Sequence, residues 1–475
     1  MNRRNILFLI SDEHQARAMS CAGHSIVKTP NLDRLAARGT RFDKAYTPSP
    51  ICVPARAALA LGRYVHDIRY WDNAMAYDGR ERGWGHILHD AGVAATSVGK
   101  LHYRNAEDPT GFTEQIVPMH IMDGVGQIWG SVRNPLPDIR RFPKVLEKIG
   151  AGYSKYNQYD ELITCRAVEW LRRYARRAEP WLLFVSFVAP HFPLIVPQEY
   201  LDLYDPADMP LPEMHPERGY TLHPWVARMR EFSDPDAIAV GDDDRRRLAI
   251  ASYYGLCSFM DAQIGHVLEE LESCGVAADT SVIYTSDHGE TLGMRGRWGK
   301  SVLYRESTQV PLIMQGPGLA AGKVCSTPVS LIDLPPTFLD HFGIAPPVDW
   351  PGRSLLRIVG EPDDPERTVF SEYHAATSPS GGFMVANARW KYHYYVGFEP
   401  ELFDLQNDPD ERMNLAGSAD HREIVTNMHS RLTSICDPDA VDARAKADQD
   451  VLVAKHGGPD VALHMGTPGE TPPPV

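Results

Sequence analysis

Asn5-Ile6-Leu7-Phe8-Leu9-Ile10 is a continuous apolar run with the length of a single strand. Such a run is typical of a parallel strand that is buried on both faces of a sheet. Asp12 stands at its carboxyl end, and in open α/β sheets that edge is where ligand sites form. We therefore predict a parallel sheet and take Asp12 as a candidate site residue; the alternative is that Asp12 caps a helix.

Similar apolar runs recur further along the chain, and each ends just before polar or charged residues. They alternate with segments that have the periodicity and the end signals of helices. Strands are predicted at 94–98, 181–187 and 281–285, and helices at 31–38, 160–176 and 253–273. This alternation predicts an α/β fold in which a large, mostly parallel sheet is sandwiched by helices.

The pattern of predicted elements changes after Leu334-Pro335-Pro336-Thr337. A turn-rich linker at 346–352 precedes strand-like segments at 383–385 and 390–395. A chain of 475 residues also exceeds what one hydrophobic core usually serves. We expect a large domain over residues 1–345, a small C-terminal α+β domain over 346–436, and a tail over 437–475 that is partly disordered or lies at an oligomer interface.

Composition and charge exclude several classes of protein. A formal net charge of -14 argues against a nucleic-acid partner, which needs a basic face. No stretch approaches the roughly 20 apolar residues of a membrane-spanning helix, and the run at 6–10 is too short for a signal peptide. The 7 cysteines are scattered without paired spacing, as in a reducing compartment. We expect a cytoplasmic protein with no membrane partner.

The segment Ile51-Cys52-Val53-Pro54-Ala55-Arg56 has a cysteine two residues before a proline and four before an arginine. It resembles the Cys-x-Pro-x-Arg signature of the sulfatases, within the alkaline-phosphatase-like superfamily, in which the motif cysteine is oxidised to formylglycine. The resemblance implies that Cys52 is the precursor of a catalytic nucleophile. The alternative from the residue alone is a buried, inert cysteine.

A second motif, Asp287-His288-Gly289, directly follows the predicted strand at 281–285. Its carboxylate and imidazole therefore reach the same sheet edge as Asp12. With an oxygen from the oxidised residue 52, they form an oxygen-rich site for one divalent cation, Ca²⁺, Mn²⁺ or Mg²⁺. The alternative for Asp287 and His288 is a capped loop.

Basic residues follow other predicted strands. Lys100 and His102 come after the strand at 94–98, His191 comes after the strand at 181–187, and Lys300 lies in a glycine-rich loop. Ammonium and imidazole groups in such positions surround a tetrahedral oxyanion and stabilise developing charge. Taken singly, each is more often a surface lysine or a structural histidine.

The resemblance to sulfatases covers residues 4 to 416, with its landmarks in family order. These landmarks are Asp12, the segment Thr29 to Ala36, the Cys52 motif, Gly99 to His102, Pro190-His191, Ser286 to Gly289, Val310 to Ile313, Trp390 to Tyr392 and Glu401 to Pro409, which leads to Asn414-Leu415. Asp287-His288-Gly289, with Tyr70-Trp71-Asp72-Asn73, is similar to choline sulfatases and phosphonate monoester hydrolases. Many sulfatases have a second aspartate after the first, where this chain has Glu13, so Glu13 is a doubtful metal ligand.

The resemblance implies a mechanism for the nucleophile. Hydrated formylglycine at position 52 offers two hydroxyls, of which one, activated by the metal, attacks sulfur or phosphorus in line. Loss of a proton from the second then expels the inorganic ester. Arg56 would support the nucleophile loop, Lys100 would hold the diol and a substrate oxygen, and His102 would orient the diol or take its proton.

Further residues face the substrate in this interpretation. His191 and Lys300 are candidates to protonate or stabilise the leaving oxygen. Asn73 is a candidate donor to the substrate oxyanion, against the alternative of a turn asparagine. Trp129 is a candidate wall for a cationic or aromatic leaving group, against the alternative of a packing tryptophan.

The sequence therefore predicts a metal-dependent hydrolase of sulfate monoesters and does not specify the leaving group. A phosphonate monoester hydrolase or phosphodiesterase with the same nucleophile is the runner-up, and a non-catalytic ligand-binding member of the fold is the third possibility. The implied partners are a small sulfate or phosphonate ester and a formylglycine-generating activity. Analogy with the same branch implies a homo-oligomer, a dimer or a tetramer.

Overall fold

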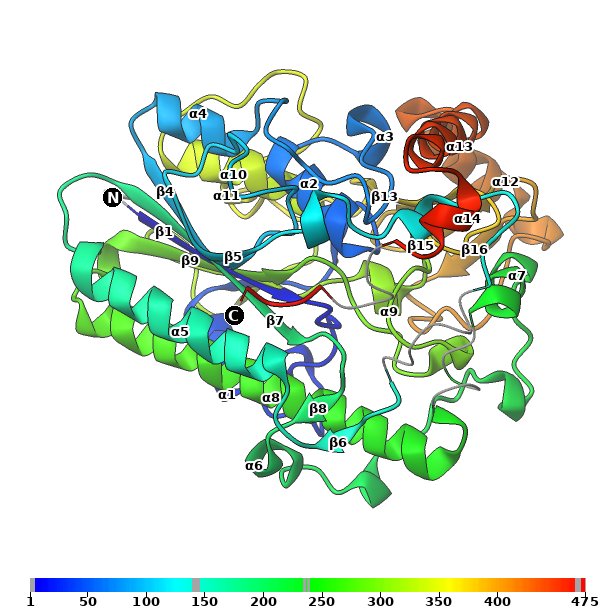
Figure 1. Ribbon diagram of the computed structural model, residues 1–475, viewed down its shortest axis with the longest axis horizontal. Coiled ribbons are helices and arrows are strands. Elements are labelled where there is room, and N and C mark those ends of the chain that lie inside the picture. Colours follow the sequence, from blue (N-terminus) through cyan, green and yellow to red (C-terminus); the bar gives the residue numbers. More distant parts are fainter. Residues whose placement is uncertain (1–4, 139–145, 234–235, 237–239, 466–470, 475) are drawn as a thin grey trace.

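The computed structural model describes residues 5–138, 146–233, 236, 240–465 and 471–474. Its centre is an 8-stranded sheet with the order β11-β2-β10-β9-β1-β7-β4-β5 (Figure 1). The strands of this sheet are β1 (Asn5–Asp12), β2 (Thr40–Phe42), β4 (Ala94–Lys100), β5 (Glu114–Met119), β7 (Trp181–Pro190), β9 (Thr280–Ser286), β10 (Leu312–Gln315) and β11 (Lys323–Cys325). All of its pairings are parallel except those of β10, which runs antiparallel to β9 and β2. The predicted large, mostly parallel sheet is confirmed.

Helices cover both faces of this sheet. The apolar side chains of β1 point alternately to the two faces, so both faces need to be covered. Ile6, Phe8 and Ile10 pack in one core with α2, α4 and α10, whereas Leu7 and Leu9 pack in another with α1, α5 and α8. The helices are α1 (Pro30–Arg38), α2 (Cys52–Leu61), α3 (Val65–Ile68), α4 (Trp84–Asp90), α5 (Lys155–Tyr174), α6 (Gln198–Leu201), α7 (Pro224–Phe232), α8 (Asp243–Ser273), α9 (Arg305–Thr308), α10 (Leu334–His341) and α11 (Leu355–Ile358). Helices α5 and α8 lie side by side below the sheet in Figure 1.

Two predicted helices begin earlier in the structure than the sequence pattern indicated. Helix α5 begins at Lys155 because Ser154 caps it, accepting a hydrogen bond from the backbone N–H of Asn157. Helix α8 begins at Asp243 because the side chain of Asp242 accepts from the N–H of Arg245. These first turns are polar, so hydrophobic periodicity did not reveal them.

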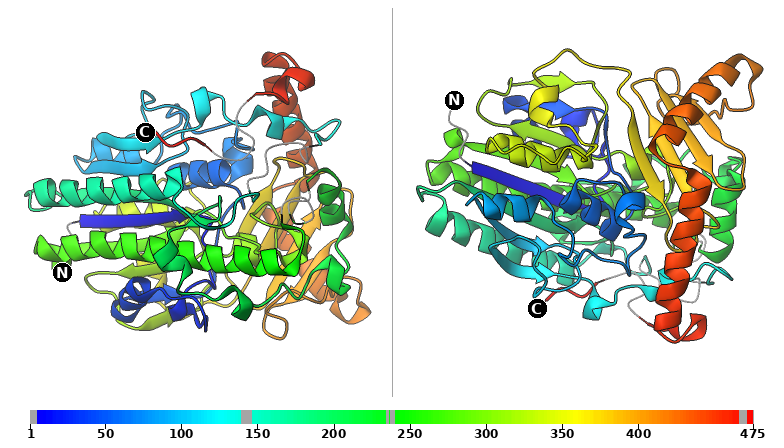
Figure 2. Two further views of the ribbon diagram at one scale, coloured as in Figure 1. Left: turned by 60° about the horizontal axis from the view of Figure 1, so that its bottom comes forward. Right: turned by 90° about the horizontal axis from the view of Figure 1, so that it is seen from above.

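A second, 4-stranded antiparallel sheet follows, with the order β13-β14-β15-β16. Its strands are β13 (Val369–Tyr373), β14 (Gly382–Ala386), β15 (Trp390–Tyr395) and β16 (Glu401–Asp404). Helix α12 (Arg422–Ile435) packs against β14 and β15, and the long helix α13 (Pro438–Lys455) runs beside them in the right-hand view of Figure 2. The predicted small C-terminal α+β unit is therefore present, while its expected boundaries at 345 and 436 stay a prediction.

The region expected to be a tail, 437–475, contains α13 and the short α14 (Pro459–Ala462). Val441 and Ala445 of α13 join the main hydrophobic core, so this helix is packed on the rest of the chain. Of the proline-rich end, residues 466–470 and 475 lie outside the described residues. Within 471–474, the carbonyl oxygen of Thr471 accepts a hydrogen bond from the hydroxyl of Tyr156 at 2.8 Å.

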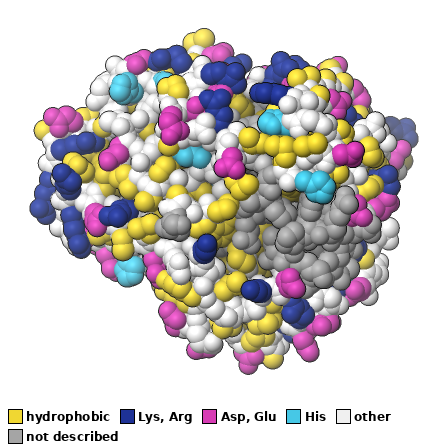
Figure 3. Space-filling model, viewed as in Figure 1, with side chains coloured by type: hydrophobic (Ala, Val, Ile, Leu, Met, Phe, Trp, Pro, Cys, Tyr) yellow, Lys and Arg dark blue, Asp and Glu magenta, His cyan; other side chains and the backbone are white. Residues whose placement is uncertain are grey.

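Short strands complete the fold: β3 (Ala45–Tyr46) pairs with β12 (Val329–Ser330), and β6 (Gly150–Ala151) pairs with β8 (Ile195–Val196). Acidic and basic side chains are interspersed over the face shown in Figure 3. Within the described ranges, no helix combines the length and hydropathy needed to cross a bilayer.

Candidate active site

Four neighbouring strands, in the order β9-β1-β7-β4, end at one edge of the large sheet. This edge therefore collects the polar residues that follow each strand. Asp12 ends β1, Lys100 ends β4, Asp287 follows β9 and His191 follows β7. Helix α2 begins above the same edge with Cys52 as its first residue, which turns the positive end of the helix dipole toward the site.

Asp12, Cys52, Asp287 and His288 form one buried cluster, as predicted. Each offers a ligand atom, and these atoms all lie within 4.8 Å of one another. The Sγ of Cys52 is 3.1 Å from Nε2 of His288 and 3.6 Å from Oδ1 of Asp12. Two carboxylates, one imidazole and residue 52 converging on one point fit a single divalent cation.

The ring of His288 is oriented for ligation. Its Nδ1 is 3.0 Å from the carbonyl oxygen of Gly289, which only accepts, so Nδ1 carries the proton in the neutral ring. Nε2 then turns its lone pair to the cluster, 3.5 Å from Asp12 and 3.7 Å from Asp287. Glycine is required next to it, because a Cβ at Gly289 would lie 2.0 Å from the carbonyl oxygen of Glu306.

Arg56 forms hydrogen bonds with residues at the ends of several strands. Its Nε donates to Oδ2 of Asp287 at 2.7 Å, and its Nη1 donates to the carbonyl oxygen of Lys100 at 2.8 Å and to Oγ of Ser186 at 3.0 Å. A further nitrogen, Nη2, lies 3.8 Å from Oδ2 of Asp12. Arg56 is thus connected to β9, β4, β7 and β1, and it positions the site without lining its pocket.

Lys100 and Asp12 form a buried ion pair. Burial by itself raises the pKa of Asp12, but the charges of Lys100, His191 and other neighbouring groups outweigh it and hold this pKa well below its usual range. Asp12 therefore stays ionised at neutral pH, as a metal ligand must.

Glu13 faces the basic residues on the substrate side. Its Oε2 accepts from Nζ of Lys300 at 2.8 Å and lies 3.3 Å from Nε2 of His191. Burial raises the pKa of Glu13 well above its usual value, although Lys300 opposes the shift. Glu13 also belongs to a second group of potential ligands, with Asp12 and His191.

The imidazole of His102 is able to accept a proton. Both of its ring nitrogens are buried and, among the described residues, neither has a hydrogen-bond partner. Burial and the neighbouring Lys100 lower its pKa well below 6.5. The imidazole is thus neutral at neutral pH and has an unused lone pair.

These groups open into a cavity of about 190 Å³. Asn73 and Trp129, both predicted to face the substrate, line it. The cavity is also lined by Cys52, Lys100, His102, His191 and Lys300. The predicted site residues therefore line this cavity with four exceptions. The exceptions are Asp12, Arg56, Asp287 and His288, which lie behind Cys52.

Several lining residues were missed by sequence reasoning. They are Gln127, Tyr156, Phe192, Trp298, Tyr373, Thr377 and Thr471 among others. Trp298 is held by a hydrogen bond from its Nε1 to Asp236 at 2.9 Å. Phe192 and Trp298 were visible as neighbours of His191 and Lys300 in sequence, whereas Tyr373 and Thr471 come from distant segments with no local motif.

The turn after β1 rests on a buried histidine. Nε2 of His14 donates to the carbonyl oxygen of Ala18 at 2.8 Å, and its Nδ1 accepts from the hydroxyl of Tyr284 at 2.5 Å. Its backbone N–H donates to Oγ of Ser286 at 2.9 Å. Burial lowers the pKa of His14 to about 4, although the hydrogen bond to the carbonyl oxygen of Ala18 opposes the shift.

The chain was compared with families of known proteins. A sequence profile described as Sulfatase matches residues 4–344, and a profile described as the C-terminal part of N-sulphoglucosamine sulphohydrolase matches residues 293–437. Together these matches cover both sheets.

Individual proteins are similar to this chain over most of its length. Arylsulfatase K of Bos taurus is 30% identical over 465 residues, which is 91% of this chain and 81% of that protein. The choline-sulfatase of Rhizobium meliloti (strain 1021) is 30% identical over 468 residues, 94% and 89% of the two chains. The solved phosphonate monoester hydrolase of Agrobacterium radiobacter superposes with a TM-score of 0.76 at 26% identity, covering 91% of this chain and 95% of that one.

We predict that removing the guanidinium of Arg56 destabilises the protein. The change Arg56→Met leaves the carboxylates of Asp12 and Asp287 buried with one countercharge fewer, so the free energy of unfolding should fall by about 3–5 kcal/mol. Urea denaturation in the presence of a chelator measures it. Arg38→Met, which removes an exposed ion pair with Glu272, should cost no more than about 1 kcal/mol. Equal losses for the two variants would contradict the role given to Arg56.

We predict an acid-sensitive contribution from His14. Its pKa is about 6.5 in the unfolded chain and about 4 in the folded one, so the unfolded state binds the proton more tightly. Stability should therefore fall by up to about 3 kcal/mol as pH drops from 6.5 through 4, and be fully present above 6.5. His14→Gln should flatten the dependence of unfolding free energy on pH between 6.5 and 4.5.

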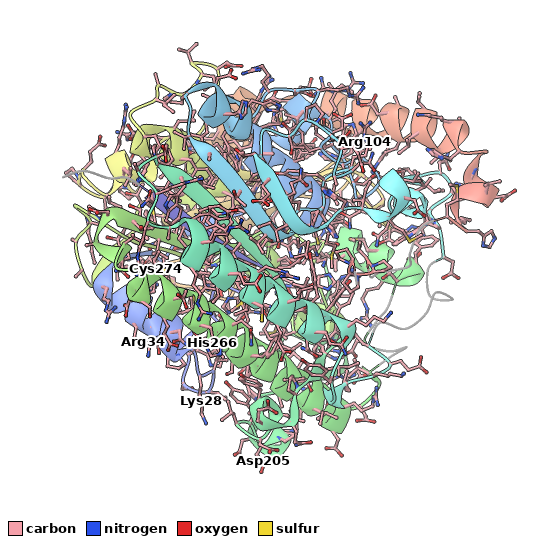
Figure 4. The ribbon with its side chains drawn as sticks, turned by 60° about the vertical axis from the view of Figure 1, so that its left-hand side comes forward. Lys28, Arg34, Arg104, Asp205, His266 and Cys274 are labelled. Atoms are coloured by element: carbon pink, nitrogen blue, oxygen red, sulfur yellow. The ribbon has the colours of Figure 1, made fainter. Side chains whose placement is uncertain are left out.

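His266→Gln is the matched control for this measurement. His266 lies on the exposed outer side of α8, where Figure 4 labels it, with 62% of its side chain accessible. Its replacement should leave the slope as in the wild type. An unchanged slope in His14→Gln would contradict the prediction.

Proposed function

The chain belongs to the sulfatase family and is a sulfuric ester hydrolase, and we propose that it cleaves sulfate monoesters to an alcohol and inorganic sulfate with a nucleophile made from Cys52. The observation that carries this proposal is the position of Cys52. Its Sγ lies between Asp12 and His288, at the start of a helix and at the floor of the cavity.

The thiol itself is a poor nucleophile in these surroundings. Burial, reinforced by the charge of Asp12, raises the pKa of Cys52 to about 12. The resemblance of the Cys52 motif to the sulfatase signature supports oxidation of Cys52 to formylglycine before turnover. Hydrated formylglycine supplies an oxygen nucleophile, and a divalent cation favours its deprotonation.

We infer that Asp12, Asp287, His288 and residue 52 hold that cation, Ca²⁺, Mn²⁺ or Mg²⁺. The support is the convergence of their ligand atoms and the orientation of His288 by Gly289. Asp12 and Asp287 are hard oxygen ligands that suit all three ions, while the imidazole favours Mn²⁺.

The cationic residues on the other side suit an ester anion. Lys100 and Lys300 are buried beside Cys52, where an ammonium interacts more strongly with a bound oxyanion than it would in water. Burial by itself lowers the pKa of Lys300, but the neighbouring acidic groups, among them Glu13 and Asp12, outweigh it and raise this pKa. Lys300 thus stays charged and is suited to stabilise negative charge on the leaving oxygen.

The two histidines differ in what they can do with a proton. His191 has Nδ1 at 2.6 Å from the carbonyl oxygen of Phe192, so in the neutral ring its proton is held there and Nε2 is an acceptor. Burial and Lys300 lower its pKa well below 6.5. Neutral His191 therefore offers an acceptor at Nε2 on the cavity side, and His102, with its unused lone pair, is the better candidate to take the proton of the nucleophile.

Phosphonate monoester or phosphodiester hydrolysis is the second candidate. It is favoured by the likeness to the phosphonate monoester hydrolase of Agrobacterium radiobacter and by the Asp287-His288-Gly289 motif. The same charged site accepts a tetrahedral phosphorus, so the choice rests on assays with both classes of ester. If Cys52 is never oxidised, a ligand-binding role remains.

We predict that Cys52 carries the chemistry. Peptide mass spectrometry across residues 45–63, on protein from a host with a formylglycine-generating activity, should find the thiol converted to an aldehyde. Cys52→Ala should lower kcat on an aryl sulfate by about 10³-fold or more, because the nucleophile is lost. Cys325→Ala, a buried cysteine in β11, is the matched control and should keep activity. Unmodified Cys52, or an active Cys52→Ala variant, would overturn the assignment.

We predict metal dependence of both activity and stability. Chelation should abolish turnover and lower Tm, because an ion that binds only the folded state stabilises it by mass action. Adding back Ca²⁺, Mn²⁺ or Mg²⁺ separately should restore both to different degrees and rank the ions. Full turnover after verified removal of bound metal would contradict this prediction.

A further inference from the structure

The amide of Asn73 has a fixed direction. Its Oδ1 accepts a hydrogen bond from the backbone N–H of Val53 at 3.2 Å, and its Nδ2 donates to Oε1 of Gln127 at 3.2 Å. Because the backbone N–H can only donate, the carbonyl end of Asn73 faces helix α2 and its NH₂ end faces Gln127.

This contact in turn fixes the amide of Gln127. Its Oε1 is used as the acceptor, so its Nε2 is the donor end. Among the described residues, no hydrogen bond from that Nε2 is found, and Gln127 lines the cavity that also contains Cys52. The donor is therefore available to a bound molecule.

The backbone beneath Gln127 is held in place. Its N–H donates to the carbonyl oxygen of Asn73 at 3.3 Å. Gly126 has φ 65°, and a Cβ there would lie 2.2 Å from the same oxygen. The loop is therefore pressed against Asn73, and the direction of Gln127 is preorganised before any ligand binds.

Hydrogen bonds link Gln127 to Asn73, and Asn73 to the helix that begins with Cys52. Asn73 is bonded to Val53, the residue next to Cys52, and Gln127 is one hydrogen bond further away. Asn73 thus contacts the residue next to Cys52 directly, whereas Gln127 is linked to it through Asn73. Trp129, two residues after Gln127 in the turn Ile128–Ser131, offers an aromatic wall on the same cavity.

We propose that Gln127 is a specificity-determining residue, which donates a hydrogen bond to an oxygen of the leaving group next to the esterified position. The preferred substrate is then a sulfate ester of a single ring that carries a hydroxyl on the neighbouring carbon and packs on Trp129. A cavity of about 190 Å³ is below the roughly 300–1,000 Å³ of pockets for drug-sized ligands, which favours one ring over an extended chain. This inference rests on the proposed function.

Two chromogenic esters that differ by this one hydroxyl test the proposal. They are 2-hydroxy-4-nitrophenyl sulfate, with a hydroxyl beside the ester, and 4-nitrophenyl sulfate, without one. In Gln127→Leu, kcat/KM should fall about tenfold more for the hydroxylated ester than for the other, since one hydrogen bond is worth about that factor. The loss should lie mainly in KM, because the contact is made with the bound substrate as well as with the transition state.

Further variants separate specificity from folding. Gln127→Met keeps the length of the side chain but has no hydrogen-bond donor, and it should give the same selective loss. Gln198→Leu, in α6 outside the cavity, is the matched control and should keep the wild-type ratio of the two substrates.

The outcomes distinguish this inference from the proposed function. An unchanged ratio of the two esters in Gln127→Leu and Gln127→Met would overturn the role of Gln127 while leaving sulfatase activity intact. Wild-type protein with oxidised Cys52 that hydrolyses neither these esters nor other sulfate esters would overturn the proposed function, and the inference with it. A selective loss on 2-hydroxy-4-nitrophenyl sulfate in both variants supports the inference.

Discussion

The buried guanidinium of Arg56 is the interaction on which the site depends. Asp12 and Asp287 are two carboxylates brought together in the interior, where like charges without a countercharge are costly. Arg56 lies beside both and also satisfies the carbonyl oxygen of Lys100 and the hydroxyl of Ser186. A planar group with five donors can serve all these acceptors at once, which a lysine cannot do. One side chain of α2 thereby holds the ends of four strands in a single arrangement.

Charge balance then divides the site into two halves. On one side, Asp12, Asp287 and His288 form a negative, ligand-rich cluster; on the other, Lys100 and Lys300 form a positive one. The halves meet in the ion pair of Lys100 with Asp12, and Lys300 also contacts Glu13. A bound cation competes for the carboxylates and a bound ester anion competes for the lysines. Binding of both together therefore preserves the balance of buried charge, which is the physical advantage of placing the two halves side by side.

The C-terminal part of the chain contributes to the same centre from a distance. Helix α13 donates from Gln449 to Asp72 at 2.8 Å, and Asp72 also accepts from Ser131 at 2.7 Å, beside Trp129. Tyr373 of β13 lines the cavity directly. The small sheet and its helices are thus part of the wall that surrounds the leaving group, in addition to covering the core.

Hydrophobic pattern and strand-end chemistry by themselves determined the large parallel sheet and the convergence of Asp12, Asp287 and His288, because parallel strands bring their carboxyl ends to one edge whatever the connections between them. The same reasoning found Lys100, His102, His191 and Lys300. Cys52 was identified from the resemblance of its motif to the sulfatase signature. Only the tertiary structure decided that Glu13 faces Lys300 and His191, that Arg56 lies beneath the pocket, and that Gln127 and Tyr373 line it. Those contacts join residues far apart in sequence through loops with no regular period, and their geometry follows from packing and hydrogen-bond direction, which local sequence does not encode.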